Sequence, residues 1–449
     1  MPRNLKKLLL DDAGGTAVYV AFFTFILVGA GALSIDFGRM TVLRTQMQNR
    51  ADAGAQAGAV YLDGRPGARN RAIAVARDVA TKSTLLAMDS TTLSVQTVNF
   101  YSSVVPLTTA SGDDDSKFIE VVLEPRNIAL MFEPVLNKSS TRVETLNARA
   151  VATANPFICH APPLMVCDPG ETNGADDLTL PANVGRQIAL KPAPASGFWA
   201  AGNYGLLALP DGSKGANDLY HALAAVQPQD CYSLDVTTAT GVKMNKIKDG
   251  INARFELPAG TPDPAPNVIN YPQDPELAGA VTGVLGSGDW DQAGYWAAKH
   301  GGTLPAALAD GTRYQTYLYE LGETFARNGR LTVYPVDGPV PPGYTLITPP
   351  GAAIPVDAGQ ADDPDHDGMP AGSVAANGPA RRLVQVAVLQ CQSEGVKGSH
   401  TYPTNGRYVE MFVTQAVPSA PEGTIYGELV TTLHPDNDPD FHANVTLVE

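Results

Sequence analysis

The chain has few charged residues, and basic residues are especially scarce. Only 17% of its 449 residues are charged, and 31 lysines and arginines stand against 46 aspartates and glutamates, for a formal net charge of −15. No block of five or six basic residues occurs anywhere. Because nucleic-acid binding depends on clustered lysine and arginine, this composition argues against a nucleic-acid-binding protein.

The sequence also lacks the short motifs that mark common active sites and metal sites. It contains no G-x-S-x-G, no H-E-x-x-H and no C-x-x-C, and its seven histidines are scattered. The glycine-rich segment 283–288 lacks the lysine of a P-loop. We therefore expect a protein that is not an enzyme and holds no cofactor; a membrane-tethered hydrolase is the least favoured alternative.

What the sequence does contain is one long uncharged segment, Gly14–Ile35, which reads GGTAVYVAFFTFILVGAGALSI. About 20 helical residues cross a hydrocarbon layer about 30 Å thick. The segment is apolar all round, unlike the amphipathic helices of soluble cores. The apolar region of a cleaved signal peptide is about 7–15 residues long, and a helical pattern continues here beyond Asp36. These features predict an uncleaved transmembrane anchor over 14–35.

The basic residues on the two sides of the apolar segment are balanced, so they do not decide its orientation. They are Arg3, Lys6 and Lys7 before it, and Arg39, Arg44 and Arg50 after it. The N-terminal amine, the cysteines and the long C-terminal region favour a cytoplasmic N-terminus, residues 1–13, with about 400 residues outside.

Cysteine is rare, with four in the whole chain, and all four lie beyond the apolar segment: Cys159, Cys167, Cys231 and Cys391. An even number in an exported region indicates two disulfides, for which three pairings are possible. The short proline-containing segment between the first two favours Cys159–Cys167 together with Cys231–Cys391.

The region 36–155 reads as helices followed by a small antiparallel sheet. The predicted helices cover 36–62, 68–88 and 127–136, and the predicted strands cover 93–101, 117–125 and 141–153. Gly54 and Gly58 form a G-x-x-x-G, for which close packing within its own domain is favoured over dimerisation. The acidic run 113–115 is most simply a hairpin tip.

The region 156–449 is richer in proline and glycine and is expected to be a separate β-rich, loop-rich domain. The predicted helices are 213–226, 242–255, 289–300 and 313–327; the predicted strands are 382–390, 407–415 and 424–431. Trp290, Tyr295 and Trp296 are expected to be core aromatics rather than a ligand platform. The fold class is therefore α+β.

One acidic loop resembles the start of a calcium site. Asp363, Asp365 and Asp367 alternate and are followed by Gly368, as in the first half of an EF-hand loop. Val374 stands where the loop would need glutamate, so a solvated acidic turn is the competing interpretation.

The N-terminal sequence resembles the TadE/TadG-like family of tight-adherence (Flp) pilus-assembly proteins. An apolar span, an acidic-glycine-arginine exit and an alanine-rich helix follow in that order. The matching residues are Asp36, Gly38, Arg39, Gln48, Ala51, Asp52, Ala53, Ala55, Gly58 and Ala59. Scattered pieces over 159–430, such as CHAPPLMVCDP and RRLVQVAVLQC, are similar to TadG-type C-terminal regions.

This resemblance implies a bacterial inner-membrane anchor, a pilin-like domain, a periplasmic body and a structural role in pilus assembly with pilins or assembly proteins as partners. A minor pilin or surface adhesin is the alternative. Two features depart from the family. Val20, not glutamate, lies five places after Gly15, which argues against pseudopilin processing, and no D-x-S-x-S adhesion site occurs.

Overall fold

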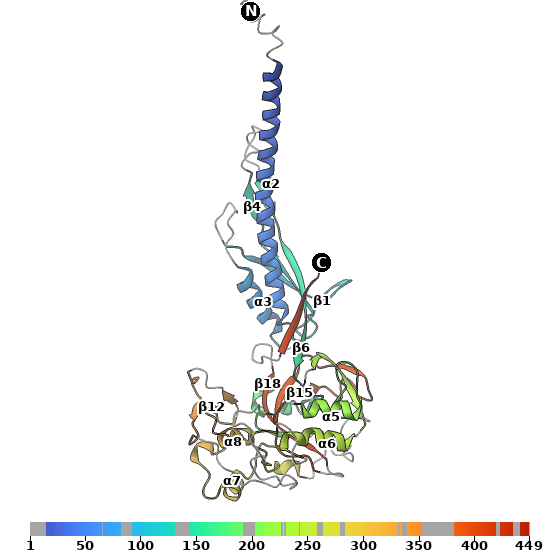
Figure 1. Ribbon diagram of the computed structural model, residues 1–449, viewed down its shortest axis with the longest axis vertical. Coiled ribbons are helices and arrows are strands. Elements are labelled where there is room, and N and C mark those ends of the chain that lie inside the picture. The colour runs from blue at the N-terminus through green and yellow to red at the C-terminus, as the bar shows by residue number, and fades with distance from the viewer. Residues whose placement is uncertain are drawn as a thin grey trace, which may run out of the picture. The chain divides into compact units, whose positions relative to one another are not determined.

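The computed structural model divides the chain into two compact units, residues 1–155 with 444–449, and residues 156–443 (Figure 1). Each unit has its own hydrophobic core. The structure describes residues 15–64, 66–81, 92–130, 143–191, 203–225, 228, 230–241, 243–257, 264–278, 283–330, 332–334, 339–351, 381–418, 423–433 and 441–448. The expected α+β class, with a long apolar helix at the N-terminus and a β-rich C-terminal body, is confirmed.

The first unit is built on one helix of 45 residues, α2 (Gly15–Ala59). No proline interrupts it, and the helix passes through Asp36 without a break, as the sequence pattern predicts. Its two halves differ in their surroundings. The N-terminal half exposes its apolar side chains, whereas the C-terminal half buries a stripe at steps of three and four that includes Leu43, Met47 and Ala51.

A second helix, α3 (Ala68–Ala80), packs along this stripe. A Cβ atom on Gly54 would lie 3.0 Å from the carbonyl oxygen of Ala76, and one on Gly58 would lie 3.1 Å from that of Ala72. The prediction that these glycines serve packing inside their own domain is confirmed. The helix ends at Ala80, eight residues before the expected end, because the chain turns to an extended conformation at Thr81.

The first unit contains most of a sheet of strand order β10-β6-β3-β1-β2, with β19 paired to β6; β10 and the end of β6 with which it pairs belong to residues 156–443. The strands of this sheet are β1 (Val95–Val104), β2 (Leu107–Thr109), β3 (Phe118–Leu123), β6 (Arg149–Cys159), β10 (Cys231–Ser233) and β19 (Phe441–Val448). Ile119, Val121 and Ala152 turn one face of the sheet into the same core as the helix stripe.

A separate two-stranded hairpin consists of β4 (Arg126–Ala129) and β5 (Val143–Leu146). The prediction of a helix over 127–136 is therefore wrong for its described part. Antiparallel pairing with β5 and burial of Ile128 in the core outweigh the weak helical pattern there.

The second unit contains a five-stranded sheet of order β7-β15-β17-β18-β8, in which only the β7–β15 pair is parallel. Two three-stranded sheets, β16-β11-β9 and β13-β12-β14, accompany it. The bounds are β7 (Met165–Cys167), β8 (Gln187–Lys191), β9 (Asn203–Leu207), β11 (Asp235–Thr240), β12 (Phe325–Asn328), β13 (Thr332–Tyr334), β14 (Thr345–Ile347), β15 (Leu383–Leu389), β16 (Thr401–Pro403), β17 (Tyr408–Val413) and β18 (Ile425–Leu433).

The helices of this unit are short, and each falls inside a predicted one. They are α5 (Ala216–Ala224), α6 (Met244–Asn252), α7 (Gln292–His300) and α8 (Arg313–Glu320), with single 3₁₀ turns at 169–171, 174–176, 181–183, 253–255, 275–277 and 306–308. The expected helix over 313–327 is too long. Gly322 adopts a left-handed conformation at φ 76°, and the chain continues as strand β12.

Candidate functional site: the apolar helix and its polar base

The N-terminal half of α2 presents its apolar side chains to the surroundings. The side chain of Phe25 is 69% exposed, and Val18, Phe22 and Phe37 are exposed to a similar degree. Among the described residues, α2 is the one helix long and apolar enough to cross a membrane. A core helix of a soluble protein would bury this surface, so the exposure is consistent with a membrane span or signal anchor near the N-terminus.

Two of the polar side chains within the apolar half, Thr24 and Ser34, satisfy their hydrogen-bonding groups inside the helix. The hydroxyl of Thr24 donates to the carbonyl oxygen of Val20 at 2.7 Å, and that of Ser34 donates to Ala30 at 2.9 Å. A hydroxyl bonded one turn back leaves no donor facing hydrocarbon. These two positions are therefore compatible with a lipid environment.

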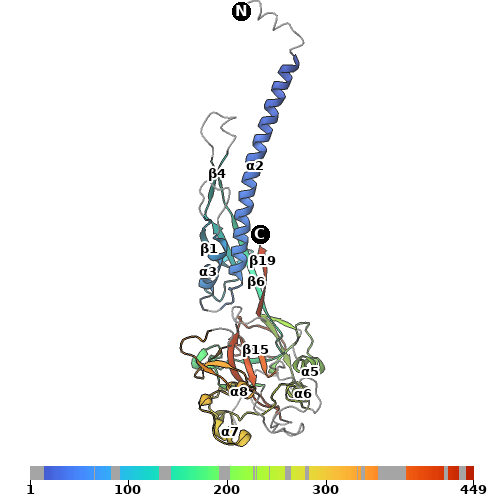
Figure 2. The same cartoon turned by 60° about the vertical axis from the view of Figure 1, so that its left-hand side comes forward.

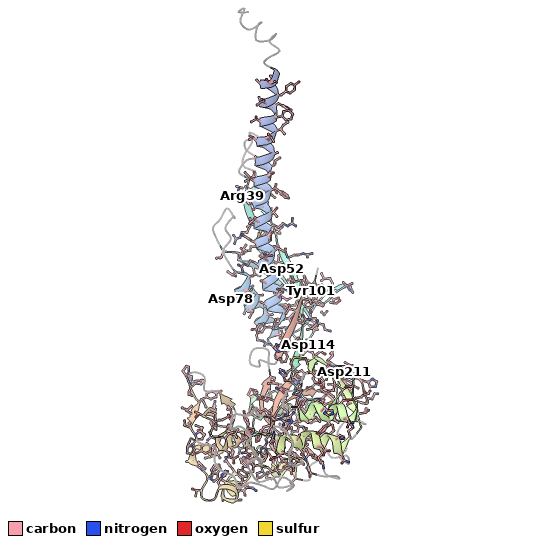
Figure 3. All side chains as sticks on the ribbon, viewed as in Figure 1. Arg39, Asp52, Asp78, Tyr101, Asp114 and Asp211 are labelled. Carbon is pink, nitrogen blue, oxygen red and sulfur yellow. A yellow bond between two sulfur atoms is a disulfide. The ribbon has the colours of Figure 1, made fainter. Side chains whose placement is uncertain are left out.

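At the base of the apolar half, Asp36 and Arg39 form an ion pair one turn apart, with 3.9 Å between Nη1 and Oδ1. Arg39 is labelled on α2 in Figure 3. Asp36 is buried, and Arg39 also donates from Nη1 to the carbonyl oxygen of Ala129 at 3.2 Å. These two residues connect the end of the uncharged segment to the hairpin β4–β5. They belong to the D-x-G-R exit that the sequence singled out.

Below this base, the first unit has a shallow groove of about 410 Å³ between α2, β6 and β19. Gln48 donates from Nε2 to Asp52 and to the carbonyl oxygen of Arg149, both at 2.8 Å. Leu447 and Val448 also line the groove. The groove therefore combines apolar side chains with the oppositely charged Asp52 and Arg149.

One residue of the acidic run 113–115, which was predicted to be a hairpin tip, caps a helix. Gly67, the residue before α3, has no side chain to cap it. Asp113 instead accepts the backbone N–H groups of Gly67 at 2.7 Å and Arg69 at 3.0 Å. The bond from Arg69 is the main reason that the pKa of Asp113 lies below its usual range.

The cysteines form two disulfides, but the favoured pairing is wrong. The bonds join Cys159 to Cys231 and Cys167 to Cys391. Strand pairing explains the difference, because Cys231 lies directly opposite Cys159 in the β10–β6 pair, and Cys167 ends β7 beside β15. Closeness in sequence was a poorer guide than strand register.

The weak calcium candidate, Asp363, Asp365 and Asp367, lies outside the described residues. Within the described parts of the chain, no group of three or more histidine, cysteine or acidic side chains could hold a metal ion.

The second unit buries a cluster around Glu320 that the sequence did not reveal. Oε1 accepts from the hydroxyl of Tyr295 at 2.7 Å and lies 2.9 Å from Nε2 of His300; Oε2 accepts from Asn267 at 2.9 Å and from the hydroxyl of Tyr271. Burial raises the pKa of both tyrosines. Glu320 is fully buried and each of its oxygens has two partners, so these bonds connect α7 and α8 to the segment that holds Asn267 and Tyr271.

The same region confirms that Tyr295 and Trp296 are core aromatics; both are buried, and Trp290 packs against their cluster. His300 stacks on Trp296 with ring centroids 4.1 Å apart. Arg382, also fully buried, donates to carbonyl oxygens of Ile269 and Val413 rather than to a carboxylate. Burial lowers its pKa.

Comparison with known proteins supports the interpretation of the N-terminal segment and does not bear on the rest of the chain. Residues 14–60 match the family model Tad, described as "Putative Flp pilus-assembly TadE/G-like". The matched TadE/G-like segment coincides with α2, including its exposed apolar half and the stripe that packs on α3. No curated protein and no solved structure matches the chain significantly.

Proposed function

We propose that the chain is a TadG-type, membrane-anchored structural component of the Flp/Tad pilus-assembly machinery. The observation that carries this proposal is the coincidence of two features in α2. Its sequence matches a pilus-assembly family over 14–60, and its apolar half is exposed in the fold. Both support a single inner-membrane span over 14–35.

The region beyond the span is proposed to be a periplasmic body of two domains, a pilin-like domain at 36–155 and a disulfide-containing domain at 156–449. Two disulfides support an oxidising compartment for the second domain, and hence a cytoplasmic N-terminus. The body would bind pilins or assembly proteins. The groove beside Gln48 and Asp52 is a suitable surface for such a partner.

A structural rather than catalytic role agrees with the family match and with the buried state of the Glu320 cluster. We propose no cofactor, and a calcium site at Asp363, Asp365 and Asp367 stays a sequence-based proposal.

A minor pilin or surface adhesin is the second candidate. The observation that favours it is the architecture of the first unit, in which a long helix with an apolar N-terminal half continues onto a small antiparallel sheet. Such a helix could anchor the subunit in a membrane first and in a helical fibre later.

Cell fractionation distinguishes these candidates. Recovery of the chain in inner-membrane fractions with an intact N-terminus supports the assembly component. A mature N-terminus at Thr16, or recovery in sheared pili, supports the pilus subunit. As a matched pair, Phe25→Arg is expected to release the chain from the membrane and Val105→Arg is not, because only Phe25 lies in the apolar span. Soluble wild-type chain with its N-terminus intact would contradict both candidates.

A further inference from the structure

We propose that the β4–β5 hairpin lies in the phospholipid headgroup layer, so that the first unit touches the membrane surface at a second place beside the anchor. The proposal rests on the membrane span proposed above. It adds a lipid-binding surface on a different element of the chain.

The distance of the hairpin from the hydrocarbon layer follows from its contact with helix α2. Arg39 lies four residues beyond Ile35, the last residue of the uncharged segment, and a helix rises about 1.5 Å per residue. Arg39 is thus about 6 Å outside the hydrocarbon, whereas each headgroup layer is about 5–8 Å thick. Its guanidinium donates to the carbonyl oxygen of Ala129 at 3.2 Å. This bond holds the end of β4 at the level of the headgroups.

Which end of the hairpin faces the membrane follows from the contacts at its two ends. Ala129 pairs with Val143 at one end and Arg126 pairs with Leu146 at the other. Arg126 donates from Nη2 to the carbonyl oxygen of Thr92, next to the start of the main sheet. Figure 2 shows β4 beside α2 and closer to the N-terminal end of the helix than β1 or α3. The Ala129–Val143 end therefore faces the membrane.

The side chains at this end suit a lipid surface. Val143 is 43% exposed, while Ile128 of the same hairpin is buried in the core. Arg39 is the partly exposed charge of α2 nearest the span, and it pairs with the buried Asp36 at 3.9 Å. Glu144 of the hairpin is half-buried. A basic group at the depth of Arg39 favours anionic headgroups. Arg44, nine residues beyond Ile35, lies about 14 Å outside the hydrocarbon and therefore beyond the headgroup layer.

The same unit provides an internal comparison. Val105 is 88% exposed and follows the last residue of β1, whereas β1 begins close to the bond between Arg126 and Thr92. The nine residue-to-residue steps of β1, at about 3.3 Å each, separate its two ends by roughly 30 Å. Val105 should therefore remain in water when Val143 meets the headgroups.

Site-directed spin labelling of the full chain in lipid nanodiscs tests this. All four native cysteines are in disulfides, so Phe25→Cys, Val143→Cys and Val105→Cys each introduce one free thiol. The discs contain phosphatidylethanolamine and phosphatidylglycerol, and collisions with oxygen and with a water-soluble nickel chelate report depth. We expect Phe25 in hydrocarbon, Val143 at headgroup depth with severalfold less nickel access than Val105, and Val105 in water.

The outcomes separate the two proposals. A label at Val143 as accessible to nickel as the label at Val105, with Phe25 still in hydrocarbon, overturns the headgroup contact alone. A label at Phe25 that is accessible to nickel overturns the membrane anchor itself, and the headgroup contact with it. Thermal unfolding of each labelled variant, compared with the unlabelled chain, shows whether the hairpin remains folded.

Discussion

Glu428 accepts two hydrogen bonds from Arg313, one from the backbone N–H at 3.0 Å and one from Nη1 at 3.2 Å, although the residues are 115 positions apart. The N–H of Tyr314 donates to its other oxygen at 2.9 Å. Both Arg313 and Glu428 are fully buried. A side chain of strand β18 thus caps helix α8, which fixes the helix on the central sheet.

Replacing Glu428 should strongly destabilise the second unit. Glu428→Ala leaves a buried arginine and two helix N–H groups without their acceptor, and we expect a loss of about 3–5 kcal/mol in the free energy of unfolding. The control is Asp289→Ala, which removes the exposed pair with Arg330 and should cost less than about 1 kcal/mol. Urea unfolding of the detergent-solubilised chain measures both. Equal effects would show that the buried pair is not what holds α8.

The contact between α2 and α3 should depend on its two glycines. Gly58→Val adds atoms where even a Cβ would lie 2.6 Å from Ile119 Cδ1 and 3.1 Å from the carbonyl oxygen of Ala72. We expect a loss of about 1–3 kcal/mol from overpacking. Gly38→Val on the same helix meets no atom within 4 Å and should be nearly neutral. Thermal unfolding compares the two, and a neutral Gly58→Val would contradict the close packing.

Peptide mapping under non-reducing conditions should recover Cys159 linked to Cys231 and Cys167 linked to Cys391. Any peptide with a bond between Cys159 and Cys167 would contradict this pairing. Removing Cys167–Cys391, whose residues are 224 positions apart, should destabilise by about 2–5 kcal/mol. Removing Cys159–Cys231, with a separation of 72, should cost about 1 kcal/mol less, since it closes a shorter loop.

The cap of α3 should make stability depend on pH. The pKa of Asp113 is lowered in the folded state from 3.8, so its contribution is present above that pH and is lost as pH falls through the lower folded value. Asp113→Ala should therefore cost about 0.5–2 kcal/mol at pH 7 and much less near pH ~2. Asp114→Ala, at the exposed neighbour, is the control. A difference that is constant between pH 7 and pH ~2 would exclude the carboxylate as the cap.

The helices and strands with strong periodic patterns were predictable, since α2, α7, β15 and β17 all lie within the ranges expected from sequence. The expected elements were wrong where partners distant in sequence decide the local structure. β4 is a strand because β5 pairs with it, and α8 stops at Glu320 because Gly322 turns the chain into β12. One signal was overlooked: Thr312 and Gln315 form a capping box that marks the start of α8.

By itself, the sequence determined the long apolar helix at the N-terminus. The uncharged run from Gly14 to Ile35 and the small-residue helix that follows it are local properties of the sequence. Hydropathy and helical periodicity do not depend on contacts with distant residues. The tertiary structure decided which cysteines join, which carboxylates are buried against Arg313 and His300, and how the hairpin at Ala129 meets Arg39. Those relationships join residues tens to hundreds of positions apart, and only strand register and packing bring them within bonding distance.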